Sequence, residues 1–194
     1  IDQPDKPDMP SIESACGGIF MFSREVYEKV GGFDEDLFLY HEDHDLSWRI
    51  RMMGWKLVAT SNSVCCHHYN FNKGILKFYR SEKNRLHILL KNFECKTLWL
   101  ISPALLLIEI SQIAHSIING WFYLKIKSYF EIAAQFIQIS RKRKKIQSAR
   151  RVPDSDIIKL YKATVEVSGL NNPFMDYLLN PILKIYWVCI RNWI

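Results

Sequence analysis

Short apolar runs alternate with polar segments in the front part of the chain. The run at residues 16–22, CGGIFMF, predicts a buried strand, and the runs at 55–59 and 63–68 predict two more short strands or one broken strand. Residues 24–30 predict a short helix between them. Residues 1–13 contain three prolines and are expected to form a loop, because proline supplies no N–H to a helix or a sheet.

A longer helix is expected near residues 43–53. Leu46, Ile50 and Met53 recur at helical spacing and predict the buried face of this helix. Gly54 follows as a stop signal. The front part of the chain is therefore expected to mix helices with strands.

From residue 74 onward the pattern is helical. Residues 74–93 have a basic face and an apolar face, and residues 98–108 are the most apolar stretch of the chain. The polar residues in and after this stretch share one narrow stripe: Ser102, Glu109, Gln112, Ser116 and Asn119. A spanning helix needs about 20 mostly apolar residues, and this one contains a glutamate. We therefore expect a marginal membrane segment that is in-plane, re-entrant or packed against a partner helix.

Composition and charge restrict the function classes. The 194 residues are enough for one ordinary domain, or for one domain plus a helical appendage, and they are 48% apolar with a net charge of +6. Residues 1–60 carry 12 acids and 6 bases, whereas residues 61–194 carry 8 acids and 20 bases. An acidic front and a basic rear argue against one uniform nucleic-acid-binding face. Five irregularly spaced cysteines without a CxxC pair favour a reducing compartment.

The densest polar cluster is the run His-Glu-Asp-His-Asp at residues 41–45, at the start of the expected helix. A helix N-terminus favours negative charge, so a carboxylate there is held ionised and oriented. Such a carboxylate can act as a general base. The alternative is plain helix capping, which is the commoner reason for an acidic first turn.

A second cluster, Cys65-Cys66-His67-His68, falls on a predicted strand. Neighbours in a strand point to opposite faces, so the four side chains cannot all bind one ion. One histidine at the strand end could join carboxylates in a metal site. A hydrogen-bonded histidine at the strand end is the alternative.

Several short motifs follow one another in residues 15–92. They are Gly17-Gly18, Val30-Gly31-Gly32-Phe33-Asp34-Glu35, Phe38-Leu39-Tyr40, Glu42-Asp43-His44-Asp45-Leu46 with Arg49, Gly54-Trp55, His67 and the helical run FYRSEKNRLHILLKN. In this order and spacing they resemble the second half of the catalytic domain of family 2 glycosyltransferases of the GT-A fold. Each motif alone would be weak evidence, but the ordered set is specific.

The resemblance implies an α/β fold. Residues 1–92 would form the C-terminal, acceptor-side part of a GT-A, Rossmann-like nucleotide-sugar transferase domain, and residues 93–194 a helical, membrane-associated basic tail. The implied reaction is an inverting displacement, in which an acceptor oxygen attacks the anomeric carbon of a nucleotide-activated sugar. Because the nucleotide-binding half with its Asp-x-Asp-type metal site is absent, we expect a fragment that is inactive alone.

The resemblance also implies residue roles. Asp43 is the expected general base, and Glu42 would orient it. The expected acceptor-binding residues are Phe38, Tyr40, Asp45 and Arg49. His67, with His68 as the alternative, would complete the coordination of a divalent metal, Mg or Mn, on the nucleotide diphosphate.

The rear of the chain is expected to bind an anionic membrane surface. A basic run at 141–145 follows an aromatic-rich helical region, and such runs bind anionic lipid with about 1 kcal/mol per basic residue. The residues expected at the lipid are Arg141, Lys142, Arg143, Lys144, Lys145 and Trp121. No nucleic acid partner is expected, because the basic residues do not alternate with aromatic stacking platforms.

Two functions therefore compete. The first is an inverting glycosyltransferase with a nucleotide-sugar donor and a glycan or lipid-linked acceptor, at the cytoplasmic face of the cell membrane. The second is a non-catalytic membrane-surface or protein-interaction module with a polybasic helical tail, in which the acidic cluster only caps a helix.

Overall fold

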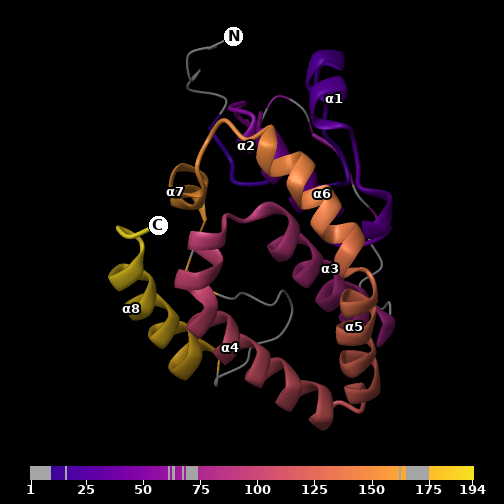
Figure 1. Cartoon of the computed structure of the whole chain (residues 1–194), viewed down its shortest axis with the longest axis vertical. Helices are drawn as coiled ribbons and strands as arrows, with labels where there is room; N and C mark the ends of the chain where they lie inside the picture. The colour runs from indigo at the N-terminus through magenta and orange to yellow at the C-terminus, as the bar shows by residue number, and fades with distance from the viewer. Residues whose placement is uncertain are drawn as a thin grey trace.

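Helices dominate the protein, which we describe from a computed structural model (Figure 1). The structure describes residues 10–15, 17–60, 62, 64–66, 68, 74–161, 163–164 and 175–194. In chain order the elements are α1 (Arg24–Val30), η1 (Glu35–Leu37), α2 (Glu42–Met52), α3 (Leu76–Asn92), α4 (Cys95–Ile118), α5 (Phe122–Ala134), α6 (Phe136–Ser148), α7 (Asp154–Ile157), η2 (Ile158–Leu160), η3 (Met175–Leu179) and α8 (Asn180–Ile190).

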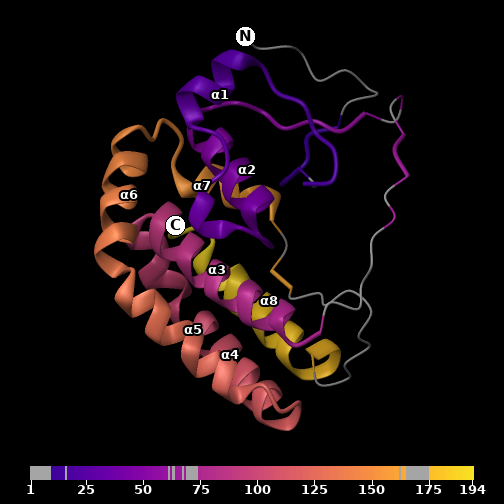
Figure 2. The same ribbon diagram turned by 90° about the vertical axis from the view of Figure 1, so that its right-hand side faces the viewer.

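Helix α3 lies at the centre of the arrangement. It packs mainly against α5 and α6 and also contacts α2, while α4 contacts α5 and α8. The short front helices α1 and α2 gather at one end of the molecule, and α4 and α8 lie toward the other end (Figures 1 and 2). The predicted boundary between two domains, after residue 92, stays a prediction. Helix α3, at the end of the first predicted domain, packs against α2 in that domain and against α5 and α6 in the second.

The predicted helices of the front part are confirmed. Helix α1 begins after Ser23, whose hydroxyl accepts a hydrogen bond from Val26 N at 3.3 Å, and it ends at Gly31 in the left-handed conformation. Helix α2 matches the range expected from the spacing of Leu46 and Ile50, which are both buried. Sequence periodicity was sufficient here, because each helix satisfies its own backbone hydrogen bonds.

The strands predicted at 16–22, 55–59 and 63–68 are not found in the described residues. The only pairing there is an isolated bridge between Ser11 and Val58. The first run is not buried either, since Met21 is 96% exposed. A strand needs a neighbouring strand to bond its backbone groups, and in the part of the chain that the structure describes only the run at 55–59 has such contacts, from Ile12 N to Leu57 O and from Ala59 N to Pro10 O. The α/β GT-A fold is therefore not confirmed.

A small apolar core joins α2 to the segment around residue 157. Trp48, Met52, Ile157 and Ile158 form one buried cluster. The Trp48 ring stacks on Phe93, with ring centroids 4.2 Å apart. This contact fixes α2 against the end of α3. It thereby sets the position of the N-terminus of α2.

Candidate functional site

An unusual backbone turn leads into α2. Tyr40 and His41 have φ angles of 73° and 65°, a left-handed conformation that costs a non-glycine residue about 1–3 kcal/mol. Helix α3 holds this turn: the buried Asn84 amide donates to Leu39 O at 2.9 Å and to Tyr40 O at 2.7 Å. His41 Nε2 lies 2.8 Å from Ser81 Oγ. Strain that the surrounding structure maintains is typical of functional sites.

The Asp43 carboxylate is oriented by two backbone N–H groups. Its Oδ2 accepts from Gly17 N at 2.9 Å, and its Oδ1 accepts from His44 N at 2.8 Å. A carboxylate has about four lone-pair sites, so two remain for another donor. Asp43 lies at the positive end of the α2 dipole, where a negative charge is favoured.

The loop that carries Gly17 is fixed to α2 by side chains further along the helix. Ser47 Oγ accepts from Ala15 N at 3.0 Å, and Arg51 Nε donates to Glu13 O at 3.1 Å. An added Cβ on Gly17 would lie 3.3 Å from Asp43 Cβ. The loop therefore approaches Asp43 closely, and glycine is the residue that permits this approach.

Glu42 is the less satisfied carboxylate of the pair. One of its oxygens, Oε2, is buried and has no hydrogen-bond partner among the described residues. Burial raises the pKa of Glu42 above its ordinary value, and the nearby charge of Asp43 adds to this shift. A carboxylate with a raised pKa beside an oriented one is an arrangement suited to proton transfer.

His41 was not predicted as a site residue. Burial and, to a smaller extent, the neighbouring His44 lower its pKa to about 4, so His41 is neutral at pH 7. The two imidazole rings lie 5.6 Å apart, measured between centroids. The sequence shows that His41 belongs to the acidic cluster, but it does not show the contact of His41 with Ser81 of α3.

Asp45 and Arg49, predicted to bind the acceptor, bind each other instead. Asp45 is fully buried, and its Oδ2 accepts from Arg49 Nε at 2.9 Å. Asn92 donates to its other oxygen at 2.8 Å, and Lys91 lies 2.8 Å from the same oxygen. These contacts give Asp45 a structural role in this arrangement.

The guanidinium of Arg49 also holds the turn after α1. It donates to Val30 O at 2.8 Å and to Gly32 O at 2.7 Å, and only 7% of the residue is exposed. Neither side chain of the Asp45–Arg49 pair offers a free polar group to an acceptor.

Phe38 and Tyr40, the other predicted acceptor residues, lie in the loop before α2. Phe38 is 80% exposed, and the Arg80 guanidinium lies 5.7 Å from its ring centroid. Tyr40 is partly buried. An exposed aromatic ring near the acidic pair is suited to contact the apolar face of a sugar ring.

The predicted metal ligand His67 lies outside the described residues, and the alternative His68 is exposed. Among the described residues, no group of three or more His, Cys, Asp or Glu side chains could hold a metal ion. Both Asp43 oxygens already accept N–H bonds. The described part of the chain therefore does not fit a metal site on its own.

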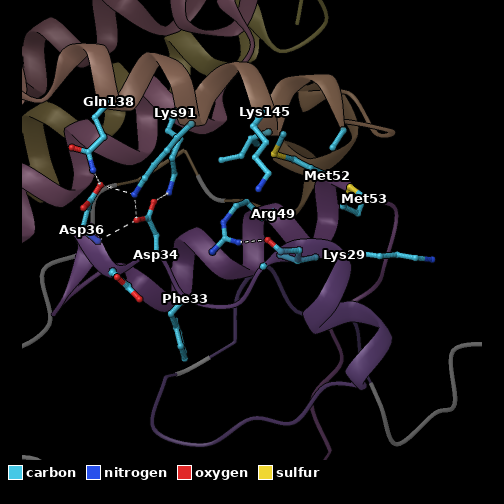
Figure 3. A pocket seen from close by; sticks show the side chains of 16 residues that line it. Lys29, Phe33, Asp34, Asp36, Arg49, Met52, Met53, Lys91, Gln138 and Lys145 are labelled. Carbon is cyan, nitrogen blue, oxygen red and sulfur yellow. Dashed lines mark hydrogen bonds and ion pairs between the residues drawn. The ribbon is translucent and has the colours of Figure 1, made fainter.

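A cavity of about 500 Å³ lies at the opposite end of α2, between α1, η1 and α6 (Figure 3). Asp34 stands at its wall and pairs with Lys91 and Lys142. Burial alone would raise the pKa of Asp34, but these two ammonium groups hold it well below its usual range. Asp43 does not line this cavity, and the Asp34 charge is already neutralised by its partners. We therefore take the N-terminus of α2, not the cavity, as the candidate site.

The predicted membrane role of Trp121 is wrong, because this residue is only 1% exposed. Its ring stacks on Phe78 with centroids 5.4 Å apart and contacts His115 edge-on at 5.7 Å. The Trp121 ring therefore lies inside the helix packing and not at a lipid surface.

The basic run at 141–145 is only partly free to meet a membrane. Lys142 pairs with Asp34 and Asp36 at 2.5 Å each, and Arg143 donates to two backbone carbonyls at the end of α3 at 2.7 and 2.6 Å. The three remaining members, Arg141, Lys144 and Lys145, are exposed. The run therefore holds α6 against α3 and the loop around Asp34.

Comparison with known proteins supports glycosyl transfer for the front of the chain. A family model described as the N-terminal domain of galactosyltransferase matches residues 5–72. Two N-acetylglucosaminyl-diphospho-decaprenol L-rhamnosyltransferases of Mycobacterium tuberculosis, from strains CDC 1551 / Oshkosh and ATCC 25618 / H37Rv, are each 36% identical over 69 residues. No solved structure matches the chain.

The match covers 36% of this chain and 22% of each relative, so the chain spans about a fifth of their length. The matched family segment contains Gly17, Glu42 and Asp43. The candidate site thus lies in the part of the chain that is similar to glycosyltransferases.

Proposed function

We propose that this chain forms the acceptor side of an inverting glycosyltransferase of the family 2, GT-A type. The enzyme transfers a sugar from a nucleotide-sugar donor to a hydroxyl of a glycan or lipid-linked acceptor. The observation that supports this most is the Glu42–Asp43 pair at the strained start of α2, inside the segment similar to glycosyltransferases.

Asp43 is the proposed general base. Gly17 N and His44 N orient its carboxylate, and the two remaining lone-pair sites can accept the proton of an acceptor hydroxyl. The acceptor oxygen then forms a bond to the anomeric carbon while the bond to the leaving nucleoside diphosphate breaks on the opposite face. The proton stays on Asp43, and Glu42 with its raised pKa lies beside it to share or relay that proton.

Phe38 is the proposed acceptor contact, because its ring is exposed in the loop before the site. A divalent metal, Mg or Mn, remains part of the proposal through His67, which lies outside the described residues. Such a metal would offset charge on the leaving diphosphate. The reaction steps assigned to Asp43 do not depend on it.

A lipid-linked acceptor and a site at the cytoplasmic membrane face are also proposed. The relatives act, by their names, on a sugar linked through diphosphate to decaprenol. Helix α4 is long and apolar enough to cross a membrane by length and composition. Both observations are compatible with a protein that meets its acceptor at a lipid surface.

Substitution of the two carboxylates in the complete protein tests the proposal. Asp43→Asn should lower the rate of sugar transfer by about 10²–10⁴-fold while donor binding is retained, because an amide cannot accept the proton. Glu42→Gln should cause a smaller loss, since Glu42 only assists. Glu28→Gln on the exposed surface of α1 is the matched control and should transfer sugar normally.

A non-catalytic module is the second candidate, and one observation favours it. Both Asp43 oxygens are used in N–H bonds, which is also what a capping carboxylate does. If Asp43→Asn transfers sugar at the normal rate, Asp43 is a cap and the catalytic proposal is wrong. If Glu42→Gln alone abolishes transfer, the base is Glu42 instead.

A further inference from the structure

The middle of the polar stripe of α4, from Glu109 to Ser116, lies against the protein, whereas Ser102 and Asn119 at its two ends are exposed. Glu109 accepts from Tyr129 Oη at 2.5 Å, lies 2.9 Å from Lys125 Nζ, and pairs with Arg85. Ser116, in the last turn of the helix, is fully buried. The Glu109 charge, which made this helix a marginal membrane segment, is therefore neutralised inside the helix packing.

A second face of α4, beside the polar stripe, is apolar and exposed. Trp99 is 79% exposed, Leu106 62%, Ile110 55% and Ile117 60%. These positions recur at spacings of seven, four and seven residues and form one stripe along the helix. Within α4, no charged side chain is exposed between Trp99 and its C-terminus. Polar residues inside and apolar residues outside are the reverse of a helix adapted to water.

Helix α8 continues this surface. It packs beside α4 (Figures 1 and 2), and Tyr186 Oη donates to Leu100 O at 2.6 Å. Ile185 is 68% exposed, and Val188 is 57% exposed. Soluble monomers rarely expose contiguous apolar patches of more than a few hundred Å², so a surface of this kind indicates a partner.

Length and charge decide how this surface meets that partner. The 24 residues of α4 measure about 36 Å, which is enough to cross a bilayer. The neighbouring α5 has 13 residues and measures about 20 Å, which is too short. If α4 crossed the membrane, the Glu109 ion network in its middle would enter the hydrocarbon, where charged groups are costly.

We propose that α4 and α8 form an in-plane docking surface for an anionic lipid bilayer. The surface is defined by Trp99, Leu106, Ile110, Ile117, Ile185 and Val188. The exposed basic residues at its margin, Lys96, Lys184 and Arg191, complement anionic headgroups. Trp99 and the 70% exposed Trp193 are the aromatic residues that favour the membrane–water interface.

Lipid fits this margin better than a protein partner does, because α4 and α8 themselves present apolar, aromatic and basic side chains without an exposed acid, and the exposed Asp176 lies before α8, in η3. The surface replaces the basic run at 141–145 as the main membrane contact. It deepens the proposed membrane location, and it does not depend on the roles of Glu42 and Asp43.

Vesicle co-sedimentation tests the surface. The chain should bind vesicles of equal parts phosphatidylcholine and phosphatidylglycerol and bind pure phosphatidylcholine less. The double substitution Leu106→Glu with Ile110→Glu should weaken binding at least about tenfold, because two exposed apolar side chains that the bilayer would bury are lost. Met21→Glu is the matched control, since Met21 is 96% exposed in the front part of the chain.

Cysteine labelling distinguishes an in-plane helix from a spanning one. Cys95 stands exposed at the start of α4, and Ile118→Cys places a thiol at its end. With the other cysteines replaced by serine, a membrane-impermeant maleimide outside the vesicles should label both ends. Protection of one end would mean that α4 spans the bilayer and would overturn the in-plane arrangement.

Further outcomes separate this proposal from its rivals. Equal vesicle binding by the double variant and the parent chain would overturn it. A self-associated chain that fails to bind vesicles and is dissociated by the double substitution would identify a second copy as the partner. Asp43→Asn should bind vesicles normally, and the double variant should transfer sugar to a water-soluble acceptor, so each proposal fails on its own measurement.

Discussion

Single residues decide whether the acidic cluster is more than a helix cap. The sequence correctly placed Glu42 and Asp43 in the first turn of α2, because N-terminal acids follow local rules. The left-handed backbone of Tyr40 and His41 could not be predicted, since neither residue type requires it. Their support comes from Asn84, more than forty residues away, and no local pattern shows such a contact.

Substitution of Asn84 should expose the strain in this turn. Asn84→Ala removes the donor from two carbonyl groups at Leu39 and Tyr40, and an unsatisfied buried polar group costs about 1–3 kcal/mol. We expect a loss of that size in the free energy of unfolding, measured with urea.

Asn119→Ala is the control, because Asn119 donates one exposed hydrogen bond to His115 O at 2.9 Å. Its effect should stay within about 0.5 kcal/mol. Equal losses in the two variants would show that Asn84 does not hold the turn.

Acid should destabilise the protein through its buried histidines. Burial lowers the pKa of both His41 and His87 from 6.5 to about 4. The unfolded chain therefore binds protons at a higher pH than the folded chain, so stability is complete above pH 6.5 and is lost as the pH falls toward 4. Urea unfolding at several pH values should show this decline, and His41→Gln should reduce it. A stability that stays constant across this window would contradict the burial of these rings.

At the scale of elements, helices were predictable and strands were not. Helices α1 and α2 follow from local spacing and end signals, because their hydrogen bonds are internal. The strand predicted at 16–22 depended on a distant partner, and the isolated Ser11–Val58 bridge is the pairing present among the described residues. The polar stripe of α4 was visible in the sequence, but the inward direction of Glu109 depends on Arg85 and Lys125 in other helices.

The packing of α2 against α3 should depend on Asp45 more than on any exposed ion pair. Asp45→Ala leaves Arg49 and Lys91 without their shared buried carboxylate, and loss of one partner of a buried pair costs about 3–5 kcal/mol. Chemical denaturation should show this loss. In contrast, Glu25→Ala breaks the exposed pair with Lys29 and should change the free energy of unfolding far less. If Asp45→Ala changes the free energy of unfolding only slightly and weakens acceptor binding, Asp45 has the acceptor role predicted from the sequence.

At the scale of the whole molecule, the basic tail is part of the fold. The charge of residues 61–194 suggested a solvated or lipid-bound segment, yet Lys142 and Arg143 join α6 to the front of the protein. Charge counts alone cannot show this, because the acids that neutralise Lys142 lie more than a hundred residues earlier. The proposed lipid contact therefore moves to α4 and α8, on the side away from α1 (Figure 2).

The most direct measurement is the transfer rate of Asp43→Asn in the complete protein, taken together with its thermal unfolding midpoint. Catalysis by Asp43 predicts a rate at least about 100-fold lower at a temperature where the variant is folded and binds the donor. A cap without a catalytic role predicts the opposite: a lower midpoint and an undiminished rate for the folded protein. That second result would contradict the central claim that the acidic start of α2 performs the chemistry.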